Sequence, residues 1–80
     1  MKDFENKDIK INDEVIYIQN IHTGSSSIRK CMFKGIVTEI LDKKVLIKPI
    51  YSNEFKNIGN WDNVKIYSKD VYIIRNNHEN

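Results

Sequence analysis

The sequence has 80 residues and a formal net charge of +2. A chain of this length forms one domain and buries only about 60% of the surface that its unfolded form exposes, so a deep active-site cleft is hard to build. The net positive charge is also too small to indicate nucleic-acid binding by itself. These bounds favour a small binding domain over an enzyme.

The composition favours β-structure. Fourteen Ile, five Val and eight aromatic residues stand against two Leu and no Ala. β-branched and aromatic side chains suit a pleated sheet, whereas Ala and Leu are strong helix formers. Lys, Asn and Ile together make up 35 residues. All three have AT-rich codons, which indicates a low-GC bacterium or one of its phages or mobile elements.

The cysteine count and the hydropathy indicate in which cellular compartment the protein is expected. Cys31 is the only cysteine, so no intramolecular disulfide can form, and no Cys/His spacing suits zinc. No apolar run approaches the roughly 20 residues that a membrane-spanning helix needs, and no signal-peptide pattern opens the chain. We expect a soluble cytoplasmic protein without a cofactor, a metal or a membrane contact.

The chain begins with a charged segment, residues 1–8, which we expect to be flexible with Phe4 as its only anchor. A β-domain is predicted over residues 9–75. The pair Asn12 and Asp13 favours a turn that leads into a first strand, 15–18. Residues 20–27 are polar, with one Gly and three Ser, and predict a flexible loop.

The stretch from Phe33 to Lys48 carries the strongest signal, two β-branched strands joined by a polar turn. The strands are predicted over 29–41 and 45–51. Gly35 has no side chain to pack, which indicates a bulge or a bend. Pro49 cannot donate a hydrogen bond to a ladder, so it indicates a free edge or the end of a strand.

The remaining chain predicts a polar loop over 52–60, a strand over 61–67, a short turn over 68–70, a fifth strand over 71–74 and a disordered tail over 76–80. Side chains that alternate along these strands give the predicted core: Ile11, Val15, Phe33, Val37, Ile40, Val45, Ile47, Val64, Ile66, Val71 and Ile73.

Five short strands with a long, bent second strand resemble the small SH3-like barrels. The stretches that carry the likeness are 11–15, 35–37 and the apolar alternation at 40, 45, 47, 64, 66, 71 and 73, although Asn12 stands where such domains usually have Gly. The resemblance implies a mostly antiparallel five-stranded barrel over 9–75. KOW and Tudor-type domains share this pattern and are binding modules, and Sm-like proteins are similar more faintly through 33–37 and 71–77. Ribonuclease toxins share the barrel, but their early Arg-Pro pair is absent.

Catalytic chemistry finds little support in the sequence. A nucleophile and a base would have to come from Cys31 and His22. However, Cys31 shares a predicted strand face with Phe33 and Val37, which indicates a buried structural residue. His78 lies in the tail. The carboxylates fall mostly at predicted turns, where Asp bends and caps the backbone. We therefore do not expect an enzyme.

Surface recognition remains, and residues 28–48 are its best candidate because they carry a local charge of +4 against −2 for the rest. Side chains opposite the predicted core mix basic and apolar groups, and neighbouring aromatics could add contacts. The candidate contact residues are Lys30, Lys34, Ile36, Leu46, Lys48, Tyr51 and Trp61.

Each of these residues also has a structural interpretation. In a bent strand both faces can be buried, lysines can extend around a packed rim, and Trp61 can be the largest piece of a small core. For function we predict a module that binds and modulates a protein partner, with a nucleic-acid-binding module as the alternative. The oligomeric state stays open, because an exposed strand edge could pair with a neighbour.

Overall fold

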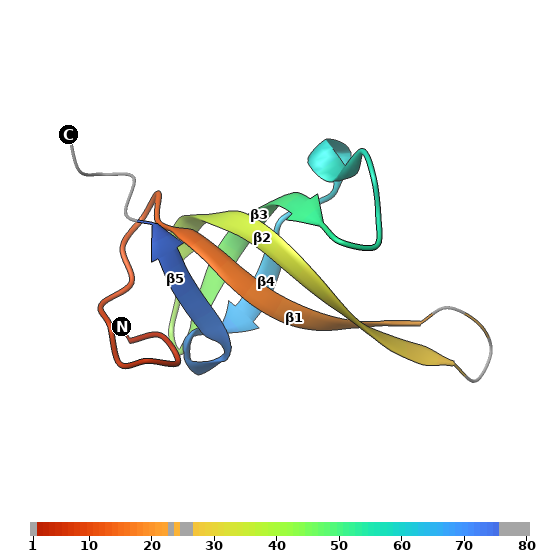
Figure 1. The fold of residues 1–80 in the computed structure, drawn as a ribbon. Coiled ribbons are helices and arrows are strands. Elements are labelled where there is room, and N and C mark those ends of the chain that lie inside the picture. Colours follow the sequence, from red (N-terminus) through yellow and green to blue (C-terminus); the bar gives the residue numbers. More distant parts are fainter. Residues whose placement is uncertain (1, 23, 25–26, 76–80) are drawn as a thin grey trace.

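A computed structural model describes residues 2–22, 24 and 27–75, which form a five-stranded antiparallel sheet (Figure 1). The strands are β1 (Glu14–His22), β2 (Ile28–Ile40), β3 (Lys44–Ser52), β4 (Val64–Tyr67) and β5 (Val71–Arg75), with 3₁₀ turns η1 (Ile58–Asn60) and η2 (Ser68–Asp70). Their order in the sheet is β4-β3-β2-β1-β5. The all-β prediction is confirmed. No pairing joins β4 to β5 in the described part of the chain, so the sheet is not closed.

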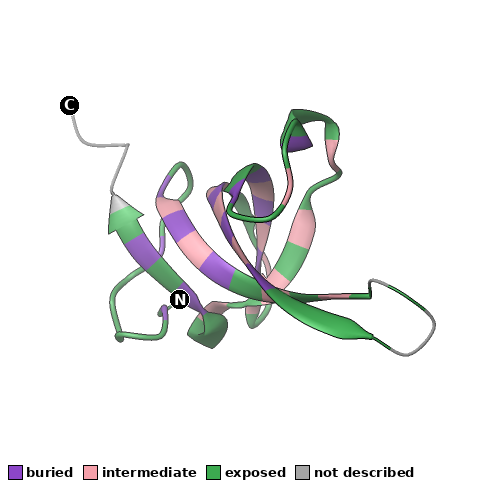
Figure 2. Ribbon diagram, turned by 45° about the vertical axis from the view of Figure 1, so that its right-hand side comes forward, coloured by how far each residue is buried: buried purple, intermediate pink, exposed green. Residues whose placement is uncertain are grey.

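The hairpin of β1 and β2 is longer than predicted. Residues 20–22, which were expected in a loop, continue β1 and pair with Ile28, Arg29 and Lys30. Isoleucines at 21 and 28 supply the β-branched residues that sustain a strand among polar neighbours. The hairpin therefore projects from the body of the sheet as an arm (Figure 1), and its far part is exposed (Figure 2).

Gly35 lies at a bend of β2, as the sequence indicated. The pairing of β2 with β3 shifts register between Lys34 and Gly35, and Gly35 lies opposite Pro49. A Cβ atom at position 35 would clash with the side chain of Ile47 and would lie 2.7 Å from the carbonyl oxygen of Lys48. The backbones approach so closely that only glycine fits.

Pro49 stands where the ladder on one side of β3 has ended. β4 pairs with β3 only from Lys44 to Ile47, so the missing N–H of Pro49 costs no hydrogen bond to β4. β3 itself continues to Ser52. Of the two outcomes that the sequence left open, a free edge is the one observed.

The core lies on the inner face of the curved sheet, in alternation along each strand (Figure 2). Seven predicted core residues are buried there, namely Val15, Phe33, Val37, Val45, Ile47, Val71 and Ile73, and so is Cys31. Val64 and Ile66 are half-buried against them. The core also contains Ile9, Tyr17 and Ile58, which the prediction omitted.

Two core predictions were wrong, and both have a local cause. Ile11 is 48% exposed because the turn at Asn12 and Asp13 leaves Ile9 as the inward side chain. Ile40 is 38% exposed, since a second register shift between Val37 and Glu39 breaks the alternation of β2 before it is reached. A bulge moves every later side chain relative to the core, and strand periodicity alone does not locate it.

The segment before β1 is attached to the sheet through Asp3 as well as Phe4, so Phe4 is not its only anchor as expected. Asp3 is 4% exposed and its carboxylate accepts a hydrogen bond from the backbone of Ile73, whereas the Phe4 side chain is 60% exposed. The predicted tail, residues 76–80, lies outside the described residues.

Candidate functional site

Side chains that alternate with the core form the outer face of the sheet, which no described segment covers completely. We define the outer face by residues of four strands: Glu14, Ile16, Ile18, Met32, Lys34, Ile36, Leu46, Lys48, Tyr51 and Tyr72. Strand pairing arranges them in rows. One row runs Tyr72, Ile16, Lys34, Tyr51 across β5, β1, β2 and β3, and a second joins Glu14, Ile36 and Lys48.

The outer face has an apolar centre and a mixed rim. Ile16, Met32 and Ile36 are half-buried by their neighbours on the face. Ile18 is 52% exposed and Tyr51 is 49% exposed. Paired side chains on one face of adjacent strands lie about 4.5–5.5 Å apart at Cβ, so these groups form a continuous surface.

The two lysines of the outer face are held in place by different groups. The ammonium of Lys34 lies 5.5 Å from the ring centroid of Tyr51, a cation–π arrangement. The ammonium of Lys48 donates to the carbonyl oxygen of Gly59 at 2.6 Å. Among the residues that the structure describes, neither lysine forms an ion pair with a carboxylate. Both positive charges are therefore available to an acidic group.

The structure brings together four of the seven predicted contact residues, since Lys34 pairs with Tyr51 and Ile36 pairs with Lys48 across β2 and β3. Leu46 lies on the same face beside Lys65 of β4. Lys30 is farther away, on the projecting arm opposite Asn20. Two residues along a strand advance about 6.6 Å, so Lys30 and Lys34 are about 13 Å apart.

Trp61 is packed with the core, which agrees with its structural interpretation. Its ring centroid lies 5.8 Å from that of Phe33 and 5.3 Å from that of Phe55. The side chain is half-buried and joins the inner cluster. Its carbonyl oxygen also lies 3.5 Å from the ammonium of Lys48. Trp61 therefore supports the outer face through its backbone while its ring fills the core.

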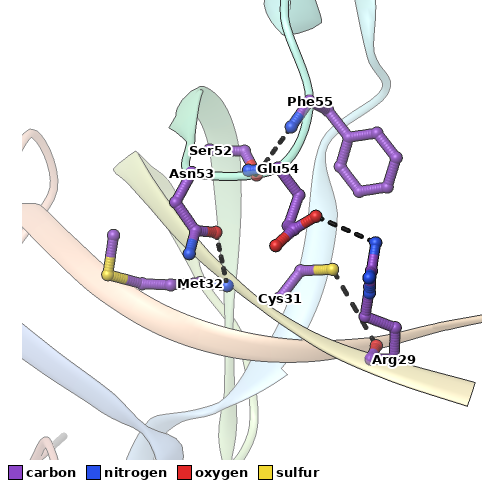
Figure 3. A network of polar contacts seen from close by, with 7 residues as sticks. All are labelled: Arg29, Cys31, Met32, Ser52, Asn53, Glu54 and Phe55. Carbon is purple, nitrogen blue, oxygen red and sulfur yellow. Dashed lines mark hydrogen bonds and ion pairs between the residues drawn. The ribbon is translucent and has the colours of Figure 1, made fainter.

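The segment after β3 is tied to β2 by a polar network (Figure 3). Asn53 accepts a hydrogen bond from the backbone N–H of Met32 at 3.3 Å, and Arg29 contacts the carboxylate of Glu54 at 3.1 Å. The hydroxyl of Ser52 accepts from the N–H of Glu54 and that of Phe55. These bonds fix the chain that directly follows Tyr51, at the rim of the outer face.

Groups suited to catalysis or metal binding do not gather in the described part of the chain. No cluster of three or more His, Cys, Asp or Glu side chains occurs there. Cys31 is buried, with its thiol 3.9 Å from the carbonyl oxygen of Arg29. Burial raises the pKa of Tyr17 to about 12, but that hydroxyl is enclosed by the core and reaches no surface. Among the described residues there is also no helix long and apolar enough to span a bilayer.

A comparison with protein families finds one match. The sequence profile of a domain of unknown function, DUF7205, matches residues 1–76. The chain belongs to the DUF7205 family. Neither the curated proteins nor the solved structures contain a match to this sequence. The DUF7205 match covers the segment before β1 as well as the sheet, so residues 1–8 are part of the domain.

Sequence reasoning missed the part of the DUF7205 outer face that lies on β1 and β5. Ile16, Ile18 and Tyr72 alternate with the core residues Val15, Tyr17 and Val71, so strand periodicity could have placed them there. Ile18 and Tyr72 also line a cleft of about 360 Å³ at the seam between β4 and β5, together with Phe4 and Tyr67. The apolar surface thus continues from the outer face into this cleft.

Proposed function

We propose that this DUF7205 domain is a non-catalytic binding module of SH3-like architecture whose outer face binds a protein. The strand order β4-β3-β2-β1-β5, with a 3₁₀ turn before β5, supports the architecture. The observation that carries the function is the continuous outer face, in which an apolar centre is framed by two lysines and two tyrosines.

An apolar centre is the reason for preferring a protein over a nucleic acid. Protein interfaces bury an apolar core inside a polar rim, and aromatic side chains contribute much of their binding energy. Ile16, Met32 and Ile36 would form that core, and Tyr51 and Tyr72 would flank it. A phosphate backbone would instead require several cations along its path, and the defined outer face carries only Lys34 and Lys48.

The charge of the outer face defines the chemistry of the partner. Lys34 and Lys48 have no carboxylate partner among the described residues. A complementary surface would place Asp or Glu against these ammonium groups and apolar side chains against Ile16 and Ile36. Glu14 lies in the same row as Ile36 and Lys48, so we expect a protein partner that places acidic groups against the two lysines only, beside apolar side chains.

A nucleic-acid-binding module is the second candidate, and the projecting arm favours it. From residue 15 to residue 38 the sequence holds Arg29, Lys30 and Lys34 and no acidic residue. A two-stranded β-ribbon can enter the major groove of DNA. However, the guanidinium of Arg29 is paired with the carboxylate of Glu54, which weakens its attraction for phosphate.

Titration against mixed DNA and RNA at rising salt tests the choice between them. Phosphate contacts make the logarithm of affinity fall linearly and steeply with the logarithm of salt concentration. The proposal expects no retention of nucleic acid at moderate salt, by the wild type or by Ile36→Glu. Salt-sensitive binding that Lys30→Glu abolishes and Ile36→Glu leaves intact would establish the second candidate.

A further inference from the structure

The two edges of the sheet are protected in different ways. The β4 edge is four residues long and carries Lys65, and short length and charge both discourage pairing with another strand. The β5 edge is longer and carries exposed Tyr72 and Ile74. Two of its outward backbone groups are bonded by residues 2–8, which we call the N-terminal clasp; Figure 1 shows this segment beside β5.

The N-terminal clasp makes the hydrogen bonds that a neighbouring strand would make. The N–H of Phe4 donates to the carbonyl oxygen of Val71 at 2.8 Å. The carboxylate of Asp3 accepts from the N–H of Ile73 at 3.0 Å, in the place of a strand carbonyl. One donor and one acceptor of β5 are thus satisfied from outside the sheet.

Internal bonds hold the clasp in this shape. The second carboxylate oxygen of Asp3 accepts from the N–H groups of Glu5 at 2.9 Å and Lys7 at 2.8 Å. Lys2 and Asp8 pair both as a backbone bridge and as an ion pair of 2.8 Å. The Phe4 ring packs against Tyr72 in a tilted arrangement, with 4.7 Å between centroids. Asp3 joins the loop to β5 and is the residue on which the clasp depends.

We propose that the β5 edge is a site for antiparallel pairing with β5 of a second copy of this chain, and that the N-terminal clasp occupies the site in the monomer. The edge is complementary to itself. A two-fold axis at Tyr72 sets Ile73 of each copy opposite Val71 of the other, so each Ile73 N–H meets a Val71 carbonyl oxygen. These are the two groups that the clasp now satisfies.

Side chains on the outer face agree with this pairing. With Val71 opposite Ile73, the two Tyr72 side chains would lie directly across the axis, and each Ile74 would lie opposite Asp70 of the other copy. Tyr72 and Ile74 are 37% and 43% exposed, so pairing would bury apolar surface as well as satisfy the backbone. The pairing uses Tyr72, which also belongs to the outer face, but it rests on the backbone groups of β5 and not on the proposed protein partner.

Opening the clasp tests the proposal. Asp3→Ala removes the acceptor of the Ile73 N–H, and Glu5→Gln is the matched control because the exposed Glu5 side chain forms an ion pair with Lys7 and, among the described residues, no bond to β5. In sedimentation velocity over a wide concentration range, wild type and Glu5→Gln should stay at 9.5 kDa while Asp3→Ala shifts toward twice that mass. Circular dichroism must show that the variant keeps its β-structure.

A second substitution identifies the surface that pairs. Tyr72→Lys, added to Asp3→Ala, would bring two ammonium groups together at the two-fold axis and should restore the monomer. A folded Asp3→Ala that stays monomeric would overturn the proposal, and so would dimers that Tyr72→Lys does not dissociate. If Asp3→Ala does not fold, Phe4→Pro decides, because it removes the N–H that donates to the carbonyl oxygen of Val71: a folded, monomeric Phe4→Pro also overturns the proposal.

Discussion

Tyr17→Phe is expected to stabilise the protein, although Tyr17 is the largest fully buried side chain. The ring stacks on Phe33 with 5.5 Å between centroids, and phenylalanine would keep this contact. The hydroxyl is buried without a hydrogen-bond partner among the described residues. An unsatisfied buried polar group costs about 1–3 kcal/mol, so its removal should raise the free energy of unfolding by about 1 kcal/mol or more. In a domain of this size that change raises Tm by about 4–8 °C.

Urea and thermal unfolding followed by circular dichroism at neutral pH measure this change. Tyr67→Phe is the matched control, because Tyr67 is 48% exposed, and it should change stability by less than about 0.5 kcal/mol. A Tyr17→Phe variant that loses more than about 1 kcal/mol would refute the reasoning, since it would mean that the hydroxyl has a partner such as an ordered water.

The dependence of stability on alkaline pH is a second test of the buried Tyr17 hydroxyl. Burial raises the pKa of Tyr17 from 10.0 to about 12, so the folded state holds this proton more tightly than the unfolded state. The stability that comes from holding this proton in the folded state is fully present below pH 10. It is lost as pH rises through 12, because the unfolded state deprotonates first. Two pKa units correspond to about 3 kcal/mol. The stability difference between wild type and Tyr17→Phe should therefore widen between pH 10 and 12, and a constant difference would contradict the assignment.

Three further substitutions test the fold by urea unfolding. Gly35→Val should cost about 3 kcal/mol or prevent folding, because a Cβ would overlap Ile47 and the Lys48 carbonyl; a loss below about 1 kcal/mol would disprove the close approach. Trp61→Ala should cost about 2–3 kcal/mol through its contacts with Phe33 and Phe55, and a neutral result would return Trp61 to the list of contact residues. Asn12 has φ 78°, so Asn12→Gly should be nearly neutral while Asn12→Ala costs about 1 kcal/mol; equal effects would argue against the left-handed turn.

The strand pattern could be predicted because it depends on local sequence. Alternation around Val15, Phe33, Val45, Val64 and Val71 predicted all five strands, and the isolated Gly35 located the bend. The turn at Asn12 followed from its tolerance of a left-handed backbone. These features are set by residues within a few positions of one another.

The remaining features depend on contacts between distant segments. The bulge after Val37, which exposes Ile40, is imposed by pairing with β3. The role of Asp3 depends on Ile73, a residue 70 positions away. The outer face was found only in part, because the sequence analysis singled out the basic hairpin, whereas strand order places β1 and β5 beside it and adds Ile16 and Tyr72. Trp61 could not be assigned, since its packing depends on Phe55 of the preceding loop.

Site-specific photocrosslinking in a nuclease-treated lysate of the native cells tests protein binding by the outer face most directly. A photoreactive amino acid replaces Tyr51 on the outer face, or exposed Lys56 of the loop after β3 as the control. We predict a discrete, nuclease-resistant protein adduct from position 51 that Ile36→Glu abolishes and that position 56 does not form. Adducts of equal yield from both positions, or adducts that nuclease removes, would contradict the account.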